Sequence, residues 1–383
     1  MDVILVIGII LVISALSCKT TNRAGLPILV GFILIGLLIG NWYKFENLST
    51  VNQICNFALL LIIFTGGFQT NFTEAKHVLA VSTVLSAAGT IITALFAGAF
   101  AYYVLHLEFY QAMLLGAVIS STDAASVFSV LRSKQMDLKN NLNSVLEVES
   151  GSNDPFAHML TTVFITLALG GSQNILLLLA SQIIIGGLSG LAFSKLGQIL
   201  INQLNLDIDG VYGVLLCGTA FLTYGVAVQL GGNGFLAAYI CGIIMGNSKL
   251  MYKGFLSRLY SAITMLMQIM LFIVLGMLCI PSSIASVVGS GLVFALFLFF
   301  IIRPIVMFAL MRPFRRTMNE IALVSWAGFR GASSIVFATY LLTAGLPYAE
   351  YVFSVVFFVC MLSVIVQGSF IVPIAKKLRL IDD

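Results

Sequence analysis

The chain has 383 residues, of which 60% are hydrophobic and only 9% are charged, and its formal net charge is +4. A water-soluble globular domain of this length needs far more surface charge, so the composition excludes that class. A mean hydropathy of +1.07 instead predicts an all-α polytopic membrane protein. The small basic excess does not indicate a nucleic-acid partner, because the basic residues lie in short connections beside apolar runs.

Thirteen apolar runs are long enough to predict transmembrane helices. In chain order they lie near residues 2–17, 27–41, 50–70, 78–104, 111–131, 143–169, 174–201, 210–229, 234–247, 261–280, 284–311, 320–343 and 350–372. The first run has no early basic residue and no obvious cleavage site, so we expect a first span there and not a secretory signal. No long hydrophilic segment interrupts the series, which predicts one transmembrane domain over 1–383 and no soluble regulatory domain.

The distribution of basic residues predicts the orientation in the membrane. With the N-terminus outside, nearly all of the 19 lysines and arginines, Arg303 among them, fall in connections on one side. Lys44 alone falls on the other side, and Arg330 lies inside a run. Because basic loops stay in the cytoplasm, the pattern predicts an outside N-terminus and a cytoplasmic C-terminus.

Two of the runs contain a polar island with a single charge. Run 111–131 contains residues 120–126 (Ser-Ser-Thr-Asp-Ala-Ala-Ser), and run 320–343 contains residues 328–334 (Gly-Phe-Arg-Gly-Ala-Ser-Ser). Such islands are typical of helices that unwind midway beside a cavity. Small residues that only let helices pack closely would explain the glycines and serines, but not the charges.

The places of these two runs in the series predict an internal symmetry. Runs five and twelve are seven apart in order, so they cross the membrane in opposite directions. This predicts two inverted-topology repeats of six helices, at about 1–170 and about 210–375, with a linker helix at about 174–201.

Run 143–169 carries acidic residues at membrane depth, within the stretch from Glu147 to Pro155. A carboxylate there is costly and by default marks an ion or proton pathway. Glu149 and Asp154 lie roughly 140° apart around a helix, so they cannot both face one partner. We expect Glu149 to form a structural ion pair with Arg330, and Asp154 to belong to an exchangeable site.

Oxygen atoms near Asp154 are candidate ligands for a monovalent cation. Asp123, Asp154, Ser150 and the carbonyl group of Thr122 can supply them. A buried carboxylate holds either a proton or a metal ion but not both well, and that competition predicts exchange. Carboxylates that only accept hydrogen bonds are the alternative interpretation. We expect Asn153 to brace the interrupted helix and not to bind the ion directly.

The ordered set Ser121-Thr122-Asp123, Glu149-Ser150-x-x-Asn153-Asp154 and Arg330 resembles the monovalent cation:proton antiporters of the NhaP and NHE branch. Residues 120–132 and 146–155 are most similar to bacterial potassium/proton antiporters of the CvrA type. The resemblance implies crossed helices five and twelve, a homodimer in the bacterial inner membrane and electroneutral, elevator-like exchange.

The same resemblance implies roles for individual residues. It implies that Asp154, Asp123, Ser150 and Thr122 hold the ion, that Glu149 pairs with Arg330, and that Asn153 stabilises the site. The chain departs from these relatives at Phe64-Thr65-Gly66-Gly67, where they often carry an acid at the position of Thr65. It also ends at Asp383, where CvrA-type proteins usually continue into regulatory domains.

The predicted function is therefore exchange of K⁺ or Na⁺ for H⁺, and the sequence does not distinguish the two cations. A proton-uncoupled, gated cation channel is the alternative. The chain lacks His-Glu-x-x-His and Gly-x-Ser-x-Gly motifs, so we expect no enzyme and no cofactor.

Overall fold

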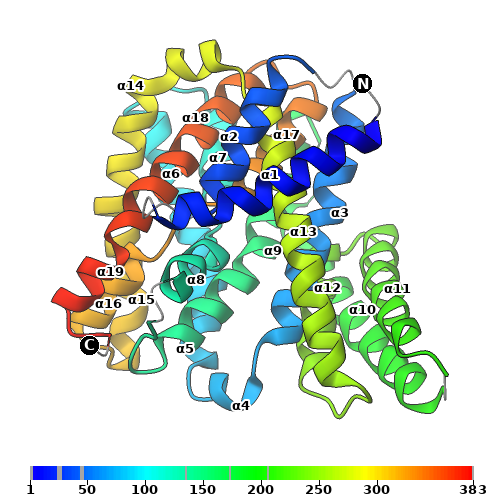
Figure 1. Cartoon of the computed structure of the whole chain (residues 1–383). Helices are drawn as coiled ribbons and strands as arrows, with labels where there is room; N and C mark the ends of the chain where they lie inside the picture. The colour runs from blue at the N-terminus through cyan, green and yellow to red at the C-terminus, as the bar shows by residue number, and fades with distance from the viewer. Residues whose placement is uncertain are drawn as a thin grey trace.

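The structure is a computed structural model that describes residues 3–23, 28–43, 47–133, 136–171, 174–204 and 207–381. Helices account for most of these residues (Figure 1). In chain order they are α1 (Val3–Arg23), α2 (Ile28–Gly40), α3 (Leu48–Gln69), α4 (Phe72–Ala75), α5 (Leu79–Val84), α6 (Thr90–Tyr103), α7 (Phe109–Ile119), α8 (Ala124–Ser133), α9 (Leu142–Ala168), α10 (Ile175–Gln203), α11 (Asp209–Gln229), α12 (Gly234–Gly246), α13 (Lys253–Met277), α14 (Pro281–Phe297), α15 (Arg303–Met311), α16 (Met318–Trp326), α17 (Ala332–Thr343), α18 (Ala349–Leu362) and α19 (Gly368–Lys377).

Several of these helices are continuous across a short turn of different pitch. Single π-helical turns join α5 to α6 (Leu85–Gly89), α14 to α15 (Leu298–Ile302) and α18 to α19 (Ser363–Gln367). Among the described residues, seven helices are long and apolar enough to cross a membrane. The expectation of an all-helical, polytopic membrane protein is therefore confirmed.

The helices form two groups that lie side by side (Figure 1). One group contains α2, α3 and α10–α13, and the other contains α5–α9 and α14–α19. We call them the first and the second group. They meet where α3 packs on α17 and where α12 packs on α9.

Within the first group, α3 and α12 pack closely through glycines. A Cβ atom on Gly67 would lie 2.5 Å from the carbonyl oxygen of Tyr239, and one on Gly242 would collide with the backbone of Phe64. Only glycine permits this approach, so Gly67, two residues after Thr65, and Gly242 let α3 pack against α12. Thr65 itself is buried, and its hydroxyl group has no hydrogen-bond partner among the described residues.

Polar side chains join the two groups where α3 meets α17. Asn52 donates to Thr343 Oγ1 at 2.5 Å and accepts from Thr339, while Tyr340 donates to Asn56. We call these five residues the α3–α17 clasp. Most of the surrounding side chains are apolar. The clasp therefore places hydrogen bonds at a defined position in the otherwise apolar interface between α3 and α17.

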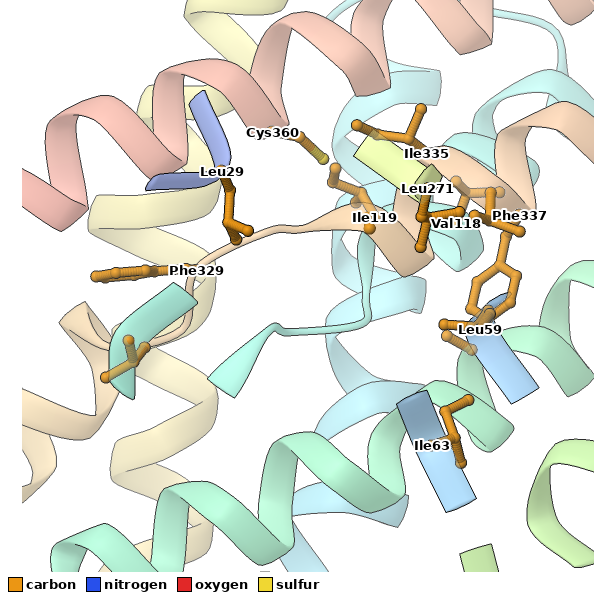
Figure 2. Close-up of a cluster of buried hydrophobic side chains, with 14 of the residues drawn as sticks. Leu29, Leu59, Ile63, Val118, Ile119, Leu271, Phe329, Ile335, Phe337 and Cys360 are labelled. Atoms are coloured by element: carbon orange, nitrogen blue, oxygen red, sulfur yellow. The ribbon is translucent and has the colours of Figure 1, made fainter. Parts of the chain in front are cut away.

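The polar islands of runs five and twelve are breaks in the helices, as the sequence predicts. Residues 120–123 separate α7 from α8, and residues 327–331 separate α16 from α17. Figure 2 shows Ile119, just before the first break, and Phe329, inside the second, among buried apolar side chains. The breaks are therefore enclosed by the protein, where irregular backbone is tolerated at membrane depth.

Candidate functional site

The two breaks are joined to each other by main-chain and side-chain hydrogen bonds. The N–H group of Asp123 donates to the carbonyl oxygen of Phe329 at 2.8 Å. Arg330 Nη1 donates to the carbonyl oxygens of Ser120 and Ser121, each at 2.8 Å. These bonds satisfy polar backbone atoms that unwinding would otherwise leave exposed in an apolar interior.

The charges in the breaks also match the ends of the half-helices. The C-terminus of α7 carries partial negative charge, and the guanidinium group of Arg330 lies against it. The N-terminus of α8 carries partial positive charge, and Asp123 caps it: Asp123 Oδ1 accepts from the N–H group of Ser126 at 3.4 Å, and Oδ2 accepts from Ser126 Oγ at 2.6 Å. The Asp123 side chain also lies against Gly331, beside the N-terminus of α17. Arg330 therefore compensates the end of α7 in the first break, and Asp123 lies beside a helix N-terminus in each of the two breaks.

The backbone of Arg330 is hydrogen-bonded to the π-helical turn that joins α18 to α19. Its backbone N–H group donates to Ser363 Oγ at 2.9 Å, and Ser363 donates to Gln367 Oε1. Gln367 in turn donates to the carbonyl oxygen of Trp326 at 2.9 Å, at the end of α16. This chain of bonds fixes the backbone on both sides of the second break.

Asp154 lies where the two breaks meet α9. It is 9% exposed, and its Oδ1 atom accepts a hydrogen bond from Ser121, in the first break. Ser333, at the start of α17, has its Oγ atom 2.9 Å from Ser121 Oγ. The carboxylate of α9, a hydroxyl group of the first break and a hydroxyl group at the start of α17 thus converge at one point. Either serine can be the donor in the bond between Ser121 and Ser333.

A second cluster of oxygens adjoins Asp154 along α9. Thr122 Oγ1 lies 3.0 Å from Ser150 Oγ and donates to Glu149 Oε2 at 3.2 Å. Asn153 Nδ2 donates to Thr122 Oγ1 at 2.5 Å, and Asn153 Oδ1 accepts from Ser121 at 3.4 Å. Asn153 is fully buried and thereby ties α9 to the first break.

The structure brings most of the predicted site residues together. Thr122, Ser150, Asn153 and Asp154 form one hydrogen-bonded group, with Glu149 at its edge. Asp123 follows Thr122 in the same break, and its side chain accepts from the N–H and hydroxyl groups of Ser126. The carboxyl groups of Asp123 and Asp154 are therefore engaged by different hydroxyl groups.

The expected ion pair between Glu149 and Arg330 is wrong. Glu149 Oε1 accepts from Arg303 Nη2 at 3.0 Å, and both side chains are buried. The Nη1 atom of Arg330, the predicted partner, instead donates to two carbonyl oxygens of the first break. Gly328 permits the actual pair, since a Cβ atom there would lie 2.5 Å from Arg303 Nε. Arg303 is thus a buried residue of α15 and not a loop residue.

Sequence reasoning missed three residues of this site: Arg303, Ser121 and Ser333. Ser121 and Ser333 belong to the two polar islands, so a hydroxyl role was open to them. Arg303 stands within run 284–311, immediately before Pro304, and a charge inside an apolar run was the available signal. Its position near the end of that run favoured the loop interpretation.

The ligand atoms are suited to a hard monovalent cation or a proton. They are carboxylate and hydroxyl oxygens, and the described residues contain no group of three or more His, Cys, Asp or Glu side chains that could hold a metal ion. Oxygen donors with one ionisable group match the preference of alkali cations better than that of zinc or copper.

Comparisons with known proteins agree with this geometry. A family model described as "Sodium/hydrogen exchanger, transmembrane" matches residues 8–377. The chain is 35% identical to the "K(+)/H(+) antiporter NhaP" of Alkalimonas amylolytica, over 98% of this chain and 67% of that protein. It is 32% identical to the "K(+)/H(+) antiporter NhaP2" of Shewanella oneidensis, over 95% of this chain and 65% of that protein. The chain thus spans about two thirds of the length of these relatives.

A solved structure has the same fold. The sodium proton antiporter MjNhaP1 from Methanocaldococcus jannaschii superposes with a TM-score of 0.85, over 98% of both chains, at 23% sequence identity. At that identity the likeness concerns the arrangement of the helices.

Proposed function

This chain belongs to the sodium/hydrogen exchanger family, and from that membership we propose that it exchanges a monovalent cation for protons across a cell membrane. We propose potassium as the preferred cation, because the similar proteins of Alkalimonas and Shewanella are named as potassium/proton antiporters. The observation that carries the proposal is the position of Asp154, a nearly buried carboxylate among hydroxyl groups where two broken helices meet.

In this proposal Asp154 carries either a proton or the cation. Ser121 and Ser333 lie beside it and can donate to the carboxylate or turn their lone pairs toward a cation. Thr122 and Ser150 supply further oxygens, and Asp123 holds the adjacent helix ends in place. Asn153 and the Glu149–Arg303 pair keep α9 in register with the breaks. Proton and cation then compete for one carboxylate, which couples their movements.

The membrane arrangement belongs to the same proposal. We propose thirteen spans, with repeats at about 1–170 and 210–375 related by inversion around a linker helix at about 174–201. The helices at each predicted range and the matched breaks support this arrangement. We also propose a homodimer in a bacterial cell membrane with the N-terminus outside, and exchange in which the second group moves against the first.

Reconstituted vesicles with a trapped pH dye test the function. An inward K⁺ gradient should drive protons out and make the lumen alkaline, because cation entry requires proton release. Asp154→Asn should abolish this response while the protein still inserts, whereas Asp209→Asn, at an exposed position at the start of α11, should leave it unchanged. A wild-type protein that gives no pH change with K⁺, Na⁺ or Li⁺, or a fully active Asp154→Asn variant, would refute the proposal.

A further inference from the structure

A groove in the surface of the second group lies outside the site described above. It runs between α15 and α16 and has a volume of about 320 Å³. On its rim, Ile305 is 55% exposed and Met318 is 57% exposed, whereas Ile321 and Ser325 on its floor are buried. Ser325 is the polar residue of the lining, and its hydroxyl group already donates to the Ile321 carbonyl oxygen at 2.7 Å. The groove therefore fits an apolar chain.

One end of the groove leads to a loop that carries arginines. Phe308 lines the groove on α15, and Arg312 follows it by four residues with helical backbone angles. Residues at that spacing lie on one face of a helix, so the Arg312 side chain continues the wall that Phe308 forms. On the opposite wall, Met318 lies three residues after Arg315. The loop between α15 and α16 thus closes the groove at this end (Figure 1).

Two of the three arginines in this loop have no opposite charge beside them. Arg316 pairs with Glu320 at 3.4 Å and donates to the carbonyl oxygen of Asn140 at 3.1 Å. Arg312 and Arg315 are exposed, and within the described ranges neither side chain has a hydrogen-bond or ion-pair partner. A guanidinium group binds phosphate oxygens through paired N–H donors, so this end of the groove fits a phosphate.

We propose that the groove and its loop bind an anionic phospholipid, with an acyl chain between α15 and α16 and the phosphate group at Arg312 and Arg315. The inference rests on the proposed orientation, in which this loop faces the cytoplasm. Basic pockets between transmembrane helices at that surface bind anionic headgroups. An apolar groove that ends at two uncompensated positive charges matches both parts of such a lipid.

The other end of the groove adjoins residues that support the candidate site. Pro304, in the lining, follows Arg303, which pairs with Glu149. Ser325, also in the lining, precedes Trp326, where α16 ends before the second break. An acyl chain in the groove packs against both elements, so lipid binding favours the folded arrangement of the break. A ligand that binds the folded protein alone raises its stability.

Lipid binding to the purified protein in detergent tests the headgroup half of the site. Phosphatidylglycerol should raise the melting temperature, and phosphatidylcholine with the same acyl chains should not. Arg312→Gln/Arg315→Gln should weaken the apparent affinity for phosphatidylglycerol by about tenfold or more, because two charged contacts are lost. Lys253→Gln/Arg258→Gln is the matched control, since it removes two exposed basic residues from α13 and should leave the affinity unchanged.

A second variant tests the acyl-chain half. Ala322 is an exposed residue of the groove lining, so Ala322→Phe places a ring in the groove and leaves both arginines intact. It should also weaken the affinity for phosphatidylglycerol by about tenfold or more, as expected when a chain is displaced from its pocket. Ala262→Phe, at an exposed position of α13, is the control and should bind the lipid as the wild type does.

The opposite results would overturn the lipid site. Equal stabilisation by phosphatidylcholine removes the role of charge, and equal stabilisation by inorganic phosphate removes the role of the groove. An unchanged affinity in Arg312→Gln/Arg315→Gln or in Ala322→Phe places the lipid elsewhere. An oligomer that dissociates in Ala322→Phe, at unchanged lipid affinity, assigns the groove to a second copy of the chain. Because none of these measurements uses transport, a failure of the proposed exchange function leaves their outcome intact.

Discussion

Glu149 and Arg303 form a fully buried pair of opposite charges, and their contribution depends on both being present. Removing one partner leaves a buried charge without compensation, which costs about 3–5 kcal/mol, whereas replacing both is often close to neutral. We therefore expect Arg303→Met to lower the melting temperature strongly and Glu149→Gln/Arg303→Met to restore much of the loss. Thermal unfolding in detergent measures both.

The Arg316–Glu320 pair is the matched control for this experiment. Its two residues are four positions apart in the sequence, and the pair is more exposed than Glu149–Arg303, with the Arg316 side chain 17% accessible. Arg316→Met should therefore cost about 1 kcal/mol or less. Equal melting temperatures for Arg303→Met and the wild type would contradict the assigned pair.

The functional importance of a single residue was predictable from the sequence where a charged side chain stands inside an apolar run. Asp154, Glu149 and Arg330 stand out because a charge inside an apolar run requires a reason. The partner of Glu149 was not predictable. The position of Glu149 around α9 and its spacing from other residues in the sequence do not reveal which of the two arginines, Arg303 or Arg330, reaches it. That choice depends on Gly328, whose missing side chain admits Arg303.

At the scale of helices, the α3–α17 clasp joins the two groups through polar side chains. Asn52→Ala removes an acceptor and a donor, and it leaves the hydroxyl groups of Thr339 and Thr343 with only their bonds to the carbonyl oxygens of Val336 and Thr339. The loss of the two bonds to Asn52 should cost about 1–3 kcal/mol. We expect a lower melting temperature for this variant. Asn319→Ala is the control, because Asn319 is exposed and makes one bond, to the carbonyl oxygen of Leu378. Unchanged melting of Asn52→Ala would show that the clasp does not hold the groups together.

The positions of the helices and of both breaks followed from the sequence, because apolar length and polar islands are local signals. The pairing of helices did not. α3 and α12 have apolar residues on most faces, so periodicity does not indicate which face meets a neighbour. Glycines such as Gly67 and Gly242 decide that contact, and their effect is visible only once the facing backbone is known.

At the scale of the molecule, the proposed orientation makes a direct prediction. Ser282, at the start of α14, should lie outside the cell, and Arg315, after α15, should lie in the cytoplasm. In a protein with its native cysteines replaced, a membrane-impermeant thiol reagent added to intact cells should label Ser282→Cys and not Arg315→Cys. Labelling of both after lysis is the control, and the reverse pattern in intact cells would contradict the orientation.

The clasp and the Asn233–Pro155 bond have a consequence for the speed of the molecule. In the proposed cycle, the groups that these bonds join move past one another, so the bonds break and re-form at every turnover. Each hydrogen bond contributes about 1 kcal/mol net to stability. Breaking it before the donor and acceptor find new partners costs more enthalpy than this net value, because both groups are unpaired in the transition state. The activation enthalpy should therefore be large, and cooling should slow turnover steeply while leaving the affinity for cations nearly unchanged.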